Sequence, residues 1–184
     1  MTDWWQSLDG TLDQAWTRMS RGVADRRSPA RHPVLATAGL DGGGEARIVV
    51  LRGASRAKAT LEAHTDAASA KAAELAANPK ATVLVWDQKA NFQMRWKVHV
   101  DLISADAVRW AKVPSTARQV YGGSPEPGGA LADPEDFQKA PDLNRFLVLH
   151  CQVTALETLH LGQDQHGRAR FTADDQWIGQ WVAP

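Results

Sequence analysis

The chain of 184 residues balances 21 basic against 21 acidic residues and is 43% hydrophobic, an ordinary composition for a soluble globular protein. This balance argues against a strongly basic nucleic-acid-binding surface, and the apolar runs are too short to span a membrane. The length predicts a single domain over residues 1–184. Because the N-terminus does not resemble a signal peptide and Cys151 is the only cysteine, we expect a cytoplasmic protein without an intrachain disulfide.

Residues 1–25 predict an amphipathic N-terminal helix. Its apolar positions lie three or four residues apart, on one face of a helix: Trp4, Leu8, Leu12, Trp16, Met19 and Val23. Pro29 and Pro33 in the basic segment that follows prevent the helix from continuing. The chain has eight tryptophans, and because large aromatic residues often anchor subunit interfaces, this number favours an oligomer.

Residues 33–53 predict a β-hairpin whose turn contains three glycines. Its second strand, ARIVVLRG at 46–53, carries Arg47 and Arg52, and a guanidinium group is costly to bury without an anionic partner. The two arginines therefore either lie at solvated strand ends or meet an anion. Positions five apart face opposite sides of a regular strand, but Gly53 indicates that the strand ends there and that Arg52 can be redirected. The glycines do not predict a dinucleotide-binding loop, because a strand and not a helix follows them.

The rest of the chain predicts further strands and few helices. Strands are expected at 59–65, 81–86, 92–103, 144–161 and 168–173. A short alanine-rich helix begins near Asp66 or Ser69 and ends at Asn78. Two short helical segments on either side of Pro114 precede residues 122–142, which are rich in proline and glycine and predict a long surface loop. Six or seven strands without β-α-β alternation predict a mainly β protein, with a closed antiparallel barrel and peripheral helices.

The start of the alanine-rich helix is a candidate anion site. A helix N-terminus offers unpaired N–H groups and the positive end of the helix dipole, and here Thr65, Ser69 and Lys71 add hydroxyl and ammonium donors. A phosphate group suits these donors, and Arg47 or Arg52 reaches the same place if the hairpin lies beside the next strand. The alternative is that Ser69 and Lys71 only cap and solvate an ordinary helix.

The sequence points to no metal or hydrolase chemistry. The six histidines are His32, His64, His99, His150, His160 and His166, and no two of them have metal-ligand spacing on one helix. Because the chain also has only one cysteine, no metal site is predicted. The chain lacks the G-x-S-x-G motif of serine hydrolases, and no carboxylate pair is marked by its context.

The order of several short motifs resembles that of a known family. These motifs are ARIVVLR, then HT followed by ASAK at a helix start, NPKATVLVW, FQMRWKV, and a C-terminal RARF with WVAP. Together they resemble the pyridoxamine 5'-phosphate oxidase family of FMN-binding split barrels, over about Arg31 to Pro184. The resemblance implies a mainly β fold, a six- to seven-stranded antiparallel split β-barrel with peripheral helices. It also implies a homodimer in which two subunits build each FMN site between them.

Residue by residue, the resemblance implies a set of FMN contacts, among which Gln93 comes from the facing subunit. The set is Arg47, Ile48, Val49, Val50, Leu51, Arg52, His64, Thr65, Ser69, Lys71, Gln93, His160 and Arg170. His160 stands where the family often has a tryptophan, and Ala70 stands where an arginine is usual. The residues expected at the substrate are Arg52, Trp110, Ser115, Arg118, His166 and Arg168.

The resemblance implies an FMN-dependent oxidoreductase, oxidase-like, that acts on a small substrate, which can be anionic. In such an enzyme the flavin carries the redox chemistry, and the protein positions and tunes it. A flavin-binding or carrier protein without turnover is the first alternative. A split barrel that holds haem or a deazaflavin is the second. The sequence assigns neither a natural substrate nor a role for residues 122–142.

Overall fold

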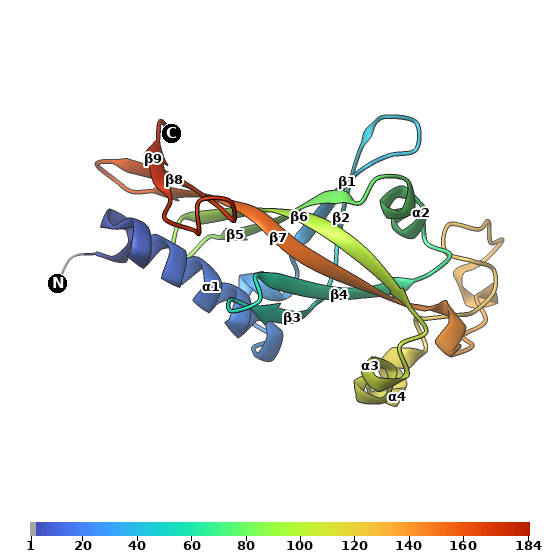
Figure 1. Ribbon diagram of the computed structural model, residues 1–184. Helices are drawn as coiled ribbons and strands as arrows, with labels where there is room; N and C mark the ends of the chain where they lie inside the picture. Colours follow the sequence, from blue (N-terminus) through green and yellow to red (C-terminus); the bar gives the residue numbers. More distant parts are fainter. Residues whose placement is uncertain (1–2) are drawn as a thin grey trace.

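The computed structural model describes residues 3–184, and within them one antiparallel sheet dominates the fold (Figure 1). Its strands are β1 (Val34–Ala38), β2 (Gly44–Ile48), β3 (Leu51–Ser55), β4 (Thr60–Asp66), β5 (Lys80–Asp87), β6 (Phe92–Ser104), β7 (Phe146–Leu161), β8 (His166–Thr172) and β9 (Gln180–Val182). The α-helices are α1 (Leu8–Ala24), α2 (Ala70–Ala77), α3 (Ala107–Lys112) and α4 (Ser115–Arg118). The strand order is β2-β1-β5-β6-β7-β4-β3, with β8 on β7 and β9 on β8.

The barrel is split between β2 and β3, which follow each other in the chain but lie at opposite ends of the strand order. ARIVVLRG is therefore not the single strand that its composition predicts. The Val49 N–H donates to Pro33 O at 3.0 Å beside the last pair of the β1–β2 ladder, and Leu51 then pairs with Ala63 of β4. The expectation of a closed barrel is wrong, because no ladder within residues 3–184 joins β2 to β3.

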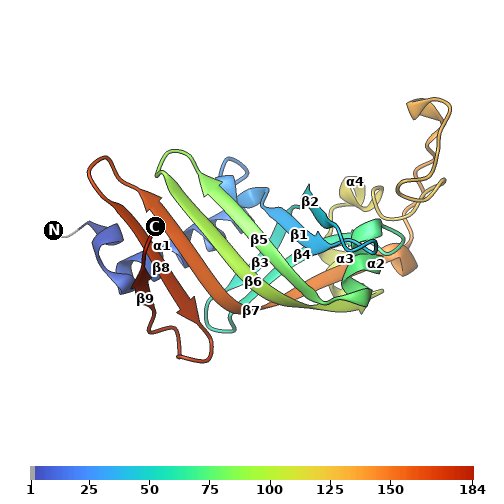
Figure 2. The same ribbon diagram turned by 90° about the horizontal axis from the view of Figure 1, so that it is seen from above.

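The strand count also differs from the six or seven expected. Residues 3–184 form nine strands, because the octapeptide contributes to two of them and the C-terminal tail adds the short β9. The longest strands, β6 and β7, pair along nearly their whole length and form the middle of the sheet (Figure 2). Their length carries the sheet from one end of the molecule to the other.

The core lies between the sheet and α1. Along β6 the side chains of Phe92, Met94 and Trp96 alternate with more exposed residues and are fully buried, as a half-buried strand requires. Trp16 of α1 packs edge-on against Trp96, with ring centroids 4.7 Å apart. The apolar stripe of α1 thus anchors this helix beneath the sheet, where Figure 1 shows it.

The helices α2, α3 and α4 gather at the other end of the molecule, with the segment 122–142 projecting beyond them (Figure 2). The start of this segment is fixed by Asp66, whose carboxylate accepts from Gly122 N–H at 2.7 Å and from Arg145 Nε at 2.9 Å. Gly122 has a φ of 107°, and a Cβ there would lie 2.1 Å from Ala140 O, so only glycine fits.

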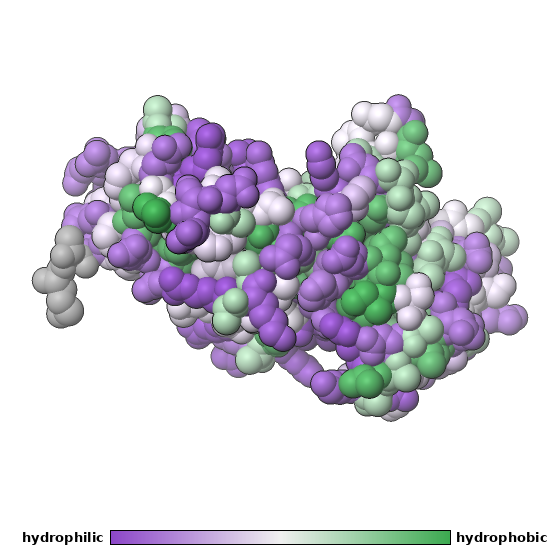
Figure 3. Space-filling model, viewed as in Figure 1, coloured by the Kyte–Doolittle hydropathy of each residue, from purple (hydrophilic) through white to green (hydrophobic). Residues whose placement is uncertain are grey.

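On the face in Figure 3, hydrophobic residues gather between α2 and the α3–α4 pair.

The helices of residues 3–184 include none with the length and apolar character that crossing a membrane requires.

Candidate functional site

Three polar residues meet where β4 ends and α2 begins. Lys71 Nζ donates to Thr65 Oγ1 at 3.1 Å, and Thr65 Oγ1 lies 3.1 Å from Ser69 Oγ. Ser69 is the N-cap of α2, but its hydroxyl bonds to Thr65 and makes no capping bond to its own helix. Thr65 and Ser69 are both buried, although hydroxyl groups usually remain at the surface. The hydroxyl groups at the start of α2 are therefore buried in contact with each other, and the Ser69 hydroxyl does not cap the helix.

Arg47 reaches the same helix from β2. Its Nη2 donates to both carboxylate oxygens of Glu74, at 2.8 and 3.1 Å, and its Nη1 donates to the Thr37 hydroxyl. The Thr37 hydroxyl in turn donates to Glu74 Oε2 at 2.5 Å. The anionic partner that the sequence requires for Arg47 is thus, within this chain, the buried carboxylate of Glu74.

The positive charges here are close enough to affect each other. The pKa of Lys71 lies below its ordinary value, first because burial penalises the charged amine and next because the Arg47 charge repels it. Glu74 and Asp66 act in the opposite direction but do not outweigh these effects. We call Arg47, Thr65, Ser69 and Lys71 the α2 cluster. A bound anion would offset the electrostatic repulsion between Lys71 and Arg47.

A second site lies between β3, β4 and α3. It is a pocket of about 440 Å³, called here the α3 pocket, lined by Arg52, Glu62, His64, Val108, Arg109, Lys112, Val113 and Pro114. Arg52 Nε is buried and has no hydrogen-bond partner among the described residues. Burial raises the pKa of Tyr121, and the charge of the nearby Arg52 guanidinium opposes this rise. Arg52 therefore stands beside the tyrosine hydroxyl at the edge of the pocket.

A chain of hydrogen bonds orders the wall of the α3 pocket. Glu62 Oε1 lies 3.0 Å from His64 Nε2, Glu62 Oε2 accepts from Arg109 Nε at 2.8 Å, and Arg109 Nη1 donates to Asp106 at 2.5 Å. Burial tends to raise the pKa of Glu62, but hydrogen bonds and charge from His64 and Arg109 prevail and lower it.

The hydrogen-bond pattern also assigns the His64 tautomer. A hydrogen on Nε2 satisfies the Glu62 carboxylate, and in the neutral ring Nδ1 is then an acceptor. Nδ1 is buried and has no partner among the described residues. The His64 side chain, which is only 7% exposed, thus has one ring nitrogen without a hydrogen-bond partner in residues 3–184.

Trp110, Ser115 and Arg118 lie beside this pocket without lining it. The Trp110 ring packs against Phe146 at 5.3 Å between centroids, and Arg118 Cζ lies 5.1 Å from the centre of the Trp110 ring. Arg118 also donates to the carbonyl oxygens of Val113 and Ala111. Arg118 is therefore engaged in holding α3 to α4, and Ser115 is exposed in the first turn of α4.

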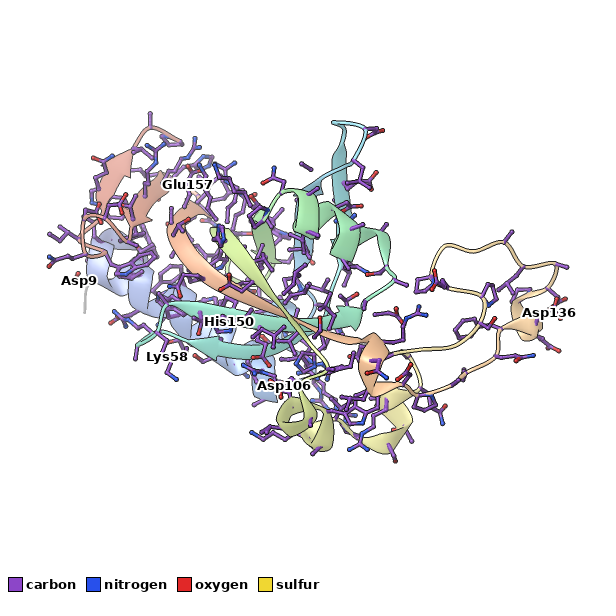
Figure 4. The ribbon with its side chains drawn as sticks, turned by 45° about the vertical axis from the view of Figure 1, so that its right-hand side comes forward. Asp9, Lys58, Asp106, Asp136, His150 and Glu157 are labelled. Carbon is purple, nitrogen blue, oxygen red and sulfur yellow. The ribbon has the colours of Figure 1, made fainter. Side chains whose placement is uncertain are left out.

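Five predicted site residues lie at the opposite end of the molecule: Gln93, His160, His166, Arg168 and Arg170. Thr65 pairs with Leu147 of β7, whereas Gln93 pairs with Leu159, twelve residues further along that strand. At about 3.3 Å per residue the two sites are roughly 40 Å apart as measured along the strand. Figure 4 shows the same division, with Asp106 beside α3 and Glu157 near the far end of β7. One copy of the chain does not bring Gln93 to the α2 cluster.

Strand register sorts these distant residues onto two faces. Gln93 and Arg170 lie on the outer face, and so do His166 and Arg168, because they pair with alternate residues of β7. Glu157 accepts from Arg168 Nη2 at 2.7 Å on that face. His160 pairs with the fully buried Phe92, which lies on the other face.

The N-terminal segment covers His160. The His160 ring stacks on Trp5 at 5.0 Å and meets Trp4 edge-on at 5.3 Å. Burial is the main cause that lowers its pKa, followed by the charge of Arg18. His160 is therefore not brought together with Gln93 and Arg170 in this chain.

The other predicted residues, Ile48 to Leu51, lie where the chain passes from β2 to β3. Ile48 is 68% exposed, whereas Val49 and Leu51 are buried in the core and Val50 is partly buried. Within residues 3–184, no group of three or more His, Cys, Asp or Glu side chains is arranged to hold a metal ion.

Sequence reasoning missed several residues that shape both sites. Glu62 lies two positions before His64, on the same face of β4, and this spacing was a usable signal. Glu74 follows Lys71 by three positions, on one side of α2, which is also readable. Arg109, Lys112 and Tyr121 come from segments whose position relative to β4 is set by the tertiary fold, so no local pattern pointed to them.

Comparison with known proteins gives consistent results. A family model described as "Pyridoxamine 5'-phosphate oxidase, FMN-binding domain" matches residues 3–104, which is more than half of the chain. No curated protein matches the chain.

Solved structures show a similar fold across nearly the whole chain. A pyridoxamine 5'-phosphate oxidase-related, FMN-binding protein from Nostoc punctiforme is 23% identical with a TM-score of 0.76, over 95% of this chain and 96% of that one. PhzG from Burkholderia lata, in complex with tetrahydrophenazine-1-carboxylic acid, is 19% identical with a TM-score of 0.74, over 95% and 91%. A protein from Clostridium acetobutylicum related to general stress protein 26 is 10% identical with a TM-score of 0.60, over 92% and 98%.

Replacing Glu62 with Gln is expected to remove a pH-dependent contribution to stability. Because the folded-state pKa of Glu62 is lowered, its contribution is present above the unfolded value of about 4.3 and is lost as pH falls through the folded pKa. We expect Glu62→Gln to cost about 1 kcal/mol at pH 7, since the carboxylate is partly exposed. The difference should shrink below about pH 4. Urea denaturation across this pH range measures it.

The matched control is Glu45→Gln, since the Glu45 side chain is 52% exposed. This variant should change the free energy of unfolding by less than about 0.5 kcal/mol at either pH. A Glu62→Gln cost that is constant from pH 3 to pH 7 would contradict the assignment.

Proposed function

Because the chain belongs to the pyridoxamine 5'-phosphate oxidase FMN-binding domain family, we propose that it binds FMN and acts as an oxidoreductase on a small anionic substrate. The observation that carries the proposal is the α2 cluster. Its Lys71 is partly buried beside Arg47 and two buried hydroxyl groups, and its pKa is lowered first by burial and next by the Arg47 charge, so an anion beside it would stabilise the charged amine. A phosphate group supplies the missing negative charge and accepts from all these donors.

The cluster fits the phosphate group of FMN on chemical grounds. Thr65 and Ser69 offer hydroxyl groups, Lys71 offers an ammonium group, and the N–H groups of Ala70 and Lys71 at the start of α2 have no backbone acceptor among the described residues. When bound, FMN would supply a hydride acceptor, chemistry that no protein side chain provides. The residues of the chain would then bind the phosphate group and form a substrate pocket that excludes water.

The α3 pocket is the proposed substrate site. Arg52 and Lys112 both line it, and neither forms a salt bridge within residues 3–184, which supports an anionic substrate. The complex of the similar PhzG with a carboxylic acid is consistent with this chemical class. His64 also lines the pocket, and its contact with Glu62 through Nε2 holds the ring in one orientation beside the proposed substrate.

A second copy of the chain is proposed to complete each flavin site. Gln93 and Arg170 share the outer face of the sheet, roughly 40 Å from the α2 cluster of the same chain by strand length. The same face carries Trp86, which pairs with Gln93 and is 43% exposed, and Ile48, which is 68% exposed. Such exposed apolar residues beside polar ones are typical of a subunit interface.

Replacing Lys71 with Ala is expected to weaken FMN binding by about 2 kcal/mol, the range of a lost charge-assisted hydrogen bond. Riboflavin, which lacks the phosphate group, should bind wild type and Lys71→Ala equally. Fluorescence titration of both flavins measures the two affinities. The matched control is Lys58→Ala, at an exposed turn, which should change neither affinity. Equal FMN affinity in wild type and Lys71→Ala would contradict the phosphate assignment.

The proposed substrate class can be tested with matched pairs of compounds. FMN-loaded protein is mixed without oxygen with small amines, alcohols and dihydroaromatic compounds, each as a carboxylic acid and as its uncharged amide. We expect acids to bleach the flavin absorption at concentrations about tenfold or more below their amides, since Arg52 and Lys112 attract the carboxylate. Protein that only dithionite reduces would instead support a flavin carrier.

Mixed dimers test whether two chains share each site. Lys71→Ala removes a residue of the α2 cluster, and Arg170→Ala removes a residue of the outer face. A dimer with one chain of each kind should retain one intact site and bind about half as much FMN as wild type, whereas each variant alone should bind weakly. Differently tagged chains allow this dimer to be isolated. The shared site is refuted if the mixed dimer binds FMN no better than the variants alone.

A further inference from the structure

Glu74 lies beside the proposed phosphate site with its charge buried. Its side chain is 6% exposed and comes from the same helix as Lys71, one turn further along. Arg47 Nη2 donates to both of its oxygens, and the Thr37 hydroxyl donates to Oε2 at 2.5 Å. These contacts occupy the guanidinium edge that a phosphate group would otherwise take in bidentate fashion.

The net charge around the α2 cluster is low for a site that would bind a doubly charged phosphate group. Arg47 and Lys71 contribute two positive charges, and Glu74 removes one of them by pairing with Arg47. Asp66 is already paired with Arg145 at 2.8 Å, so it adds little on balance. Position 70, before the lysine, holds an alanine and adds no charge. The α2 cluster therefore offers about one net positive charge to a group that carries nearly two negative charges.

We propose that Glu74 is a specificity-determining residue that lowers the affinity of the α2 cluster for the phosphate group by competing for Arg47. The inference rests on the proposed function. Its consequence is that FMN binds only modestly better than riboflavin, because the flavin phosphate must share Arg47 with a carboxylate that remains in place. This chain would thus discriminate weakly between the phosphorylated and the unphosphorylated flavin.

The variant Glu74→Gln removes the negative charge of the side chain while nearly keeping its size and shape. Glutamine keeps one oxygen that accepts from Arg47, and it has nearly the volume of glutamate, so Arg47 and Thr37 retain their places. The competing negative charge is lost, and one acceptor oxygen becomes an amide N–H group that can donate to the Thr37 hydroxyl oxygen. We expect Glu74→Gln to bind FMN about tenfold or more tightly than wild type, whereas riboflavin affinity should change less than about twofold.

Glu45→Gln is the matched control. Glu45 also approaches Arg47, with 3.6 Å between Oε2 and Nη2, but its side chain is 52% exposed and its charge is screened by water. Removal of this charge should alter FMN affinity less than about threefold, because exposed ion pairs contribute little. Isothermal titration of each protein with FMN and with riboflavin provides all the affinities.

Wild-type protein tests the inference without any substitution. We expect FMN to bind wild type no more than about a hundredfold more tightly than riboflavin, the effect of one or two charge-assisted hydrogen bonds. A preference on the order of ten-thousandfold would overturn the inference, since it requires a fully available Arg47. A Glu74→Gln variant that binds FMN no more tightly than wild type would also overturn it.

Failure of the proposed function gives a different result. If wild type binds neither FMN nor riboflavin, the flavin assignment itself fails, and this inference fails with it. If both flavins bind but Glu74→Gln weakens FMN alone, Glu74 acts by positioning Arg47 for the phosphate rather than by competing for it. That outcome retains the flavin site and rejects the competition.

Discussion

The short link of Val49 and Val50 between β2 and β3 determines where the functional groups of this chain can lie. These two residues take the backbone from one end of the strand order to the other, so the sheet must curve until its two edges come near each other. Val49 keeps one bond to Pro33 and Leu51 pairs at once with Ala63, which leaves little freedom for the turn. As a result, Arg47 faces α2 and Arg52 faces α3, although only four residues separate them.

The same link explains why the sequence predicts much of the fold but not the split. Alternating burial along β6 and the stripe of α1 follow from side-chain periodicity, which is a local property. The run from Ile48 to Leu51 has uniformly high β propensity, so no local signal marks the place where one strand ends and another begins. Only the competition between β1 and β4 for this backbone decides it, and that is a tertiary effect.

The candidate sites follow the same rule. Thr65, Ser69 and Lys71 lie within seven residues of sequence, and local reasoning about a helix start was enough to group them. The partner of Arg47 lies 27 residues away in the chain, on a helix whose burial depends on the sheet beneath it. Likewise, Arg109 meets Glu62 across 47 residues. Sequence patterns identified the donors, whereas the pairing of Glu74 with Arg47 and of Glu62 with Arg109 depends on how the elements pack together.

The distribution of ion pairs gives the strongest physical reason to expect an anionic ligand. Most arginines that pack into the fold have carboxylate partners, as Arg18 has in Asp87 and Arg95 has in Glu157. Arg52 and Lys71 are partly withdrawn from water, yet neither forms a salt bridge with a carboxylate in the part of the chain that the structure describes. Withdrawing a cation from water without a counter-ion costs free energy that increases with its burial. A fold that maintains two such cations, one at each proposed subsite, is stabilised when anions bind there, and a flavin phosphate and an acidic substrate are anions of the required kind.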